Sequence, residues 1–83
     1  MIDANQMKAA RALVGMKQDE LAQHTGLSVQ TIKRMESLGT EKSSAGNVQS
    51  VQKALEAAGV QFIPENGGGA GVRLSKPRAM GGA

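Results

Sequence analysis

The sequence predicts a mainly α-helical domain in which four helices are followed by a short β-hairpin. Apolar residues recur at spacings of three and four up to residue 58, which is typical of helices with one buried side. A glycine comes directly after three of these helical segments and suits a helix end. Beyond residue 59 the apolar period falls towards two, which indicates strands.

The composition describes a small domain without catalytic chemistry. The chain has 83 residues, 40% of them hydrophobic, with no cysteine and a single histidine. We expect one domain over residues 1–74 with a thin aliphatic core. Neither a disulfide, a metal site nor a cofactor is expected, and no catalytic set of side chains points to an enzyme. No apolar run approaches the ~18 residues of a membrane span, and no secretory signal is present, so the expected location is cytoplasmic.

The first helix is expected over residues 3–14. Asp3 can cap its amino end, and Gly15 suits a left-handed cap at its carboxyl end. The apolar stripe of this helix consists of Met7, Ala10, Leu13 and Val14.

The second and third helices are expected over residues 18–25 and 28–37. Ser28 can cap the third helix, whereas Lys17 stands at the cap position of the second and cannot accept a backbone N–H. Asp19 and Glu20 place negative charge at the positive end of the second helix.

The rest of the domain is a fourth helix and two strands. The helix is expected over residues 47–58, with Val48, Val51, Leu55 and Ala58 on its buried side. The strands are expected over residues 60–63 and 72–74, and residues 75–83 are expected to be a disordered tail. The glycine-rich stretch 67–71 lacks the spacing and the Lys-Ser/Thr ending of a phosphate-binding loop, so a hairpin loop is the better interpretation.

Residues 18–37 contain two short helices joined by a turn, which is the helix-turn-helix plan. Ala22 is small enough for the third helix to cross close above it. Gly26 can adopt the positive φ of a sharp turn. Ile32 and Met35 can anchor the third helix on the core. In such motifs the second of the two helices enters the major groove of DNA.

These segments resemble the lambda-repressor-like (Xre-type) helix-turn-helix transcriptional regulators over about residues 5–59. The matching motifs are Arg11-Ala-Leu, Gln18-Asp-Glu-Leu-Ala, Gly26-Leu-Ser and Thr31-Ile-Lys-Arg-Met-Glu36. The segment 60–74 resembles the C-terminal strands of a small bacterial subgroup. The resemblance implies a cytoplasmic homodimer that binds double-stranded DNA sequence-specifically, usually as a repressor, with residues 28–37 as the recognition helix.

The resemblance also implies site residues. Ser28, Val29, Gln30 and Lys33 match groove-facing positions, and Arg34 borders them. Gln18 matches a position that contacts phosphate or supports the recognition helix, and Arg11 with Glu36 matches a structural salt bridge. Lys17 and Thr25 depart from the usual residues, which implies a less firmly docked second helix.

The chemistry of these side chains agrees with those roles. Gln30 can pair with adenine and Lys33 with guanine, whereas Val29 can contact a thymine methyl group or make no base contact. We expect base contacts from Val29, Gln30 and Lys33. The expected backbone contacts come from Gln18, Ser28, Arg34, Thr40, Lys42 and Ser43. For Lys42 and the loop serines, simple solvation is an equal alternative.

The net charge alone does not indicate that the chain binds DNA. The formal charge is +3, but residues 1–70 hold seven basic and seven acidic side chains, and the excess comes from Arg73, Lys76 and Arg78. A protein-interaction module, such as an antitoxin-like domain, therefore remains an alternative. The edges of strands 60–63 and 72–74 are candidate dimer contacts, because an unpaired edge invites another strand.

Overall fold

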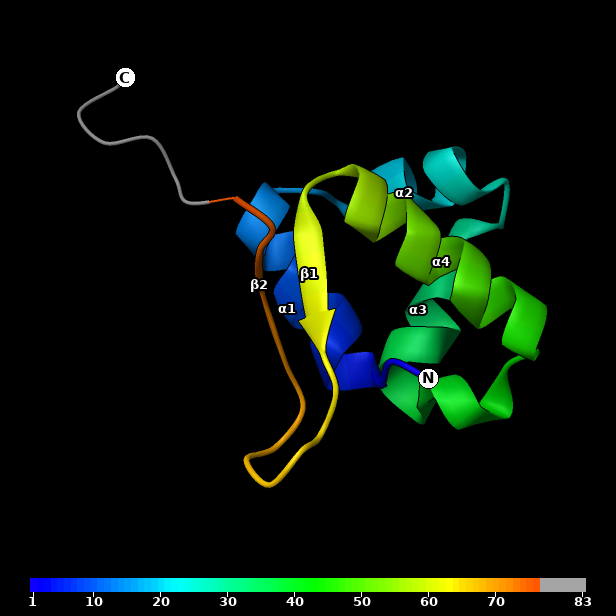
Figure 1. Cartoon of the computed structure of the whole chain (residues 1–83). Helices are drawn as coiled ribbons and strands as arrows, with labels where there is room; N and C mark the ends of the chain where they lie inside the picture. Colours follow the sequence, from blue (N-terminus) through cyan, green and yellow to red (C-terminus); the bar gives the residue numbers. More distant parts are fainter. Residues whose placement is uncertain (77–83) are drawn as a thin grey trace, which may run out of the picture.

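A computed structural model describes residues 1–76 of the chain, so residues 77–83 of the expected tail lie outside the described residues. Four helices are followed by a two-stranded antiparallel hairpin, which confirms the expected mainly α fold (Figure 1). The elements are α1 (Ala4–Val14), α2 (Gln18–Thr25), α3 (Val29–Leu38), the 3-10 turn η1 (Thr40–Lys42), α4 (Ala45–Ala57), β1 (Val60–Ile63) and β2 (Gly71–Leu74).

Capping side chains explain where the helices begin. Asp3 accepts a hydrogen bond from the backbone N–H of Gln6 at 2.7 Å and starts α1. Ser44 accepts one from the N–H of Asn47 at 3.2 Å, so α4 begins at Ala45, two residues before the expected start. α2 has no side-chain cap at Lys17.

The end of α4 and the start of β2 also differ slightly from expectation. Ala58 is the exposed C-cap of α4 and is not part of its buried side. β2 includes Gly71 because this residue pairs with Ile63 of β1.

The core lies where the four helices meet, and β1 closes one end of it through Val60. Each helix contributes side chains that are fully or almost fully buried, and this distribution fixes the orientation of α3 against the other three helices. The buried apolar residues are Ile2, Met7, Ala10, Leu21, Ala22, Ile32, Met35, Val48, Val51, Leu55 and Val60.

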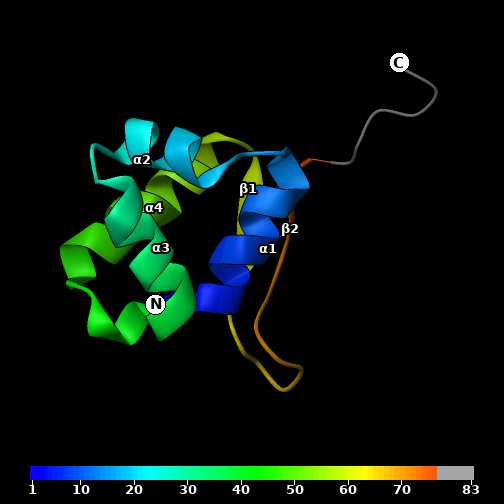
Figure 2. The same cartoon turned by 180° about the vertical axis from the view of Figure 1, so that it is seen from behind.

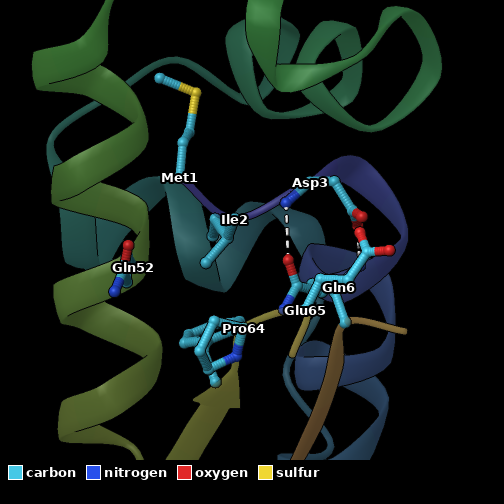
Figure 3. Close-up of a pocket in the computed structure, with 9 residues that line it drawn as sticks. Met1, Ile2, Asp3, Gln6, Gln52, Pro64 and Glu65 are labelled. Carbon is cyan, nitrogen blue, oxygen red and sulfur yellow. Dashed lines mark hydrogen bonds between the residues drawn. The ribbon is translucent and has the colours of Figure 1, made fainter. Parts of the chain in front are cut away.

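A buried glutamine, Gln6, joins α1 to the hairpin. Its Nε2 donates to the carbonyl oxygens of Ile63 at 3.3 Å and Gly71 at 3.0 Å. Its Oε1 accepts the N–H of Asp3 at 2.9 Å, which completes a capping box (Figure 3). α1 therefore holds the hairpin through the amide donor of Gln6, whose acceptor closes the cap of the same helix. An open cleft of about 380 Å³ lies beside this contact, lined by the N-terminal segment, α4 and the hairpin (Figure 3).

Replacing Gln6 by glutamate is expected to lower the free energy of unfolding by about 1–3 kcal/mol. The carboxylate can still accept the N–H of Asp3, but it cannot donate to the two hairpin carbonyls and it repels them. Asn5→Glu adds the same charge at the exposed neighbouring position and is the matched control. Urea unfolding measures both variants, and equal stability of the two would show that the bonds to the hairpin contribute little.

Candidate nucleic-acid interface

The connection between α2 and α3 has the geometry of a sharp turn. Gly26 ends α2 with φ at +75°, a conformation that L side chains rarely adopt. Ala22 is only 8% exposed in α2, which packs directly against α3. A larger side chain at this position would push the two helices apart.

Thr25 gives the turn hydrogen bonds that an aliphatic residue cannot give. Its hydroxyl donates towards the carbonyl oxygens of Leu21, at 2.9 Å, and Ala22, at 3.1 Å. The same oxygen accepts the N–H of Leu27 at 3.2 Å. The departure from the usual residue at position 25 therefore ties the turn to α2 through local hydrogen bonds.

Lys17 is compensated in a similar way at the other end of α2. The Oε1 of Glu20 accepts the backbone N–H of Lys17 at 2.8 Å. Glu20 thereby supplies the acidic half of a capping box, although the lysine side chain itself makes no cap hydrogen bond.

α3 is anchored by one side and open on the other. Ile32 and Met35 are fully buried. Gln30, Lys33 and Arg34 lie on the exposed side, and within residues 1–76 no hydrogen bond engages their side chains. The outer side of the helix is therefore free to meet another molecule, and it presents an amide and two cations.

The two residues at the start of α3 are partly engaged with the chain itself. Ser28 caps the helix: its Oγ accepts the N–H of Thr31 at 3.1 Å and lies 2.9 Å from the hydroxyl of Thr31. Val29 is half-buried and packs against the core. Only part of the Val29 side chain is left for an outside contact.

An ionic cluster of Arg11, Gln18 and Glu36 connects three helices. Arg11 donates through Nε to Glu36 Oε2 at 2.6 Å and through the terminal nitrogen Nη2 to Oε1 at 2.7 Å. Its Nη1 donates to the carbonyl of Met16 at 3.0 Å. Gln18 donates from Nε2 to Glu36 Oε1 at 3.0 Å. α1, the start of α2 and the end of α3 are thus held by one buried carboxylate.

Arg11 stays protonated at ordinary pH. The hydrogen bond with Glu36 raises the pKa of Arg11, against a smaller opposing effect of burial. A raised pKa stabilises the fold below that pKa, and this contribution is lost only as the pH rises through it, far into alkali.

Because the Gln18 amide carries a second N–H, it can support α3 and still offer a hydrogen-bond donor to another molecule.

The loop after α3 corrects one expectation. Thr40 is 2% exposed, and its hydroxyl donates to the carbonyl of Ile2 at 2.7 Å. Its side chain therefore fastens the N-terminal segment to η1 and is not available to a DNA phosphate. Lys42 is exposed and Ser43 is half-buried, so both remain candidates for such a contact.

Gln6 is a structural residue that the sequence patterns did not single out. The spacing Asp3-x-x-Gln6 is a capping-box signature and could have indicated the helix start. No local pattern indicates the contacts of Gln6 with the hairpin or of Thr40 with Ile2, because those partners are distant in the sequence.

Comparison with protein families agrees with this geometry. The helix-turn-helix family model matches residues 7–60, which is more than half of the chain and includes α2, the turn and α3. The chain belongs to the helix-turn-helix family. The match confirms the lambda-repressor-like resemblance, and it makes this a domain of the DNA-binding transcription-regulator kind. No match was found among curated proteins.

The helix-turn-helix family is a regulatory family rather than a typically enzymatic one. Within residues 1–76, no cluster of three or more metal-ligating side chains occurs. In the same part of the chain, every helix is too short or too polar to cross a bilayer.

Proposed function

We propose that this helix-turn-helix protein is a cytoplasmic, homodimeric transcription regulator that binds double-stranded DNA sequence-specifically, and that it acts as a repressor. The observation that carries the proposal is the outer side of α3. This side is polar and basic, its side chains Gln30, Lys33 and Arg34 are exposed and make no hydrogen bond within residues 1–76, and Ile32 and Met35 anchor the helix from below. A helix presented in this way fits the major groove.

The proposed base contacts come from the first half of α3. Gln30 pairs with an adenine, Lys33 donates to a guanine, and the exposed part of Val29 contacts a thymine methyl group. With so few base-reading groups, one domain reads about 3–4 base pairs. Two copies are needed for useful specificity, and the hairpin is the proposed contact between them.

The proposed phosphate contacts surround these residues. Arg34 and Lys42 supply positive charge, Ser28 and Ser43 supply short polar groups, and Gln18 offers its second amide N–H at the start of α2. Backbone N–H groups at the amino ends of α2 and α3 add to this set. Such contacts position the protein on the duplex without reading its sequence.

Two substitutions separate base reading from phosphate binding. Gln30→Ala is expected to weaken binding to a selected duplex by about 1–3 kcal/mol and to remove the preference at one base pair. Lys42→Ala is expected to weaken all duplexes alike and to reduce the slope of log affinity against log salt by about one. Fluorescence anisotropy on the selected duplex and on its single-base-pair variants measures both effects.

Salt dependence also tests the alternative of a protein-interaction module. The affinity for DNA through several phosphates falls steeply as the salt concentration rises, whereas the affinity of an apolar protein interface need not fall with salt.

Equal effects of Gln30→Ala on selected and random DNA would contradict the role assigned to Gln30. Absence of a salt-dependent complex with either DNA would contradict the proposed function as a whole.

A further inference from the structure

The hairpin has one covered edge and one open edge. α1 packs on both strands and α4 packs on β1. In both views β1 lies between α4 and β2, and within residues 1–76 no further strand pairs with β2 (Figures 1 and 2). An isolated two-stranded hairpin is marginally stable in water, and its open edge carries backbone groups without partners.

The strand register identifies which backbone groups point outwards at this edge. The N–H of Ser75 donates to the carbonyl of Gly59 at 2.8 Å, one step beyond the pair Val60–Leu74. Hydrogen-bonded and non-hydrogen-bonded pairs alternate along an antiparallel ladder. The backbone groups of Arg73 therefore point towards β1, whereas those of Val72 and Leu74 point out of the edge. Within residues 1–76, the backbone N–H and C=O groups of Val72 and Leu74 make no hydrogen bond to another element.

We propose that the β2 edge binds the β2 edge of a second copy of this chain, so that the two hairpins form one four-stranded antiparallel sheet. This inference rests on the homodimeric function proposed above and names its interface. A two-fold axis through Arg73 pairs Val72 with Leu74 of the other copy and the reverse. That register satisfies all four outward groups of each strand, and the contact is self-complementary, as two-fold symmetry requires.

The side chain of Arg73 is arranged in a way that permits this pairing. Two arginines face each other directly at the two-fold axis, and like charges at such positions are unfavourable. In each copy, however, Arg73 Nε donates to Gln61 Oε1 at 3.0 Å. This bond draws the guanidinium over β1 and away from the edge, so the two charges are separated.

A two-fold axis perpendicular to the sheet keeps both copies of α1 on the same face of the four-stranded sheet, because α1 packs on both strands of each hairpin.

Cysteine cross-linking tests this interface directly, because the chain has no cysteine of its own. In the proposed register the two Cα atoms at position 73 lie about 4.5 Å apart, within the range of a disulfide. We expect Arg73→Cys to form a disulfide-linked dimer under mild oxidation at low protein concentration. Gln61→Cys lies on the same exposed face but one strand away, with its copies about 14 Å apart, and is expected to remain monomeric.

The cross-linking result tests the β2–β2 interface independently of DNA binding. Equal cross-linking of both variants, or none of Arg73→Cys, would overturn the β2–β2 interface even if the unmodified protein binds DNA. Selective cross-linking at position 73 supports the interface even if neither form binds DNA. In that case only the proposed function fails. The expected result for the intact proposal is that the cross-linked dimer binds a two-half-site duplex at least as tightly as the reduced protein.

Discussion

Replacing Arg11 by alanine is expected to lower the free energy of unfolding by about 3–5 kcal/mol. The Glu36 carboxylate is only 5% exposed and receives two N–H bonds from Arg11. Without the guanidinium, Gln18 alone hydrogen-bonds to this buried negative charge. A domain of this size has a total stability of roughly 4–12 kcal/mol, so the loss is a large fraction of it.

Urea unfolding measures this loss, with Lys8→Ala as the control. Lys8 is an exposed cation on the same helix, and its removal is expected to change stability by less than about 0.5 kcal/mol. The double variant Arg11→Met with Glu36→Leu removes both charges and is expected to be more stable than Arg11→Ala alone. If Arg11→Ala is as stable as the control, the ionic cluster does not hold the three helices together.

Replacing Ile32 by alanine is expected to lower stability by about 2–5 kcal/mol. Ile32 is fully buried beneath the outer side of α3, so its removal leaves a cavity where the helix is anchored. We also expect weaker binding to selected and random DNA alike, because a loosened helix presents all its contacts poorly.

Gln30→Ala is the matched control for this variant, because it lies two residues away on the exposed side of the same helix. It is expected to keep the stability of the unmodified protein and to lose preference at one base pair only. Thermal unfolding and DNA titration on both variants distinguish the anchoring side from the reading side. A selective loss of one base preference in Ile32→Ala, with unchanged stability, would contradict the assignment.

The elements that local patterns determine could be predicted closely. The apolar spacing within α2 and α3 and the glycine at position 26 come from neighbouring residues, and the structure has α2 over Gln18–Thr25, as expected. α4 begins two residues before the start that the sequence predicts, because Ala45 and Gly46 carry no apolar pattern and the cap at Ser44 determines the boundary.

Contacts between distant segments could not be predicted in the same way. The sequence predicts Thr40 to be a loop residue open to DNA, but its hydroxyl donates to the carbonyl of Ile2, 38 residues away along the chain. The bonds of Gln6 to Gly71 join residues that only the folded chain brings together. A pattern of spacing describes one element at a time and carries no information on such partners.

Selection of bound fragments from a pool of random duplexes tests the central claim most directly. If the outer side of α3 reads the major groove in a dimer, the enriched fragments will contain two inverted half-sites of about 3–4 base pairs, one helical turn apart. The Gln30→Ala variant will enrich the same spacing with one position of each half-site relaxed. Enrichment of no common sequence, or of an identical sequence by both proteins, would contradict this account.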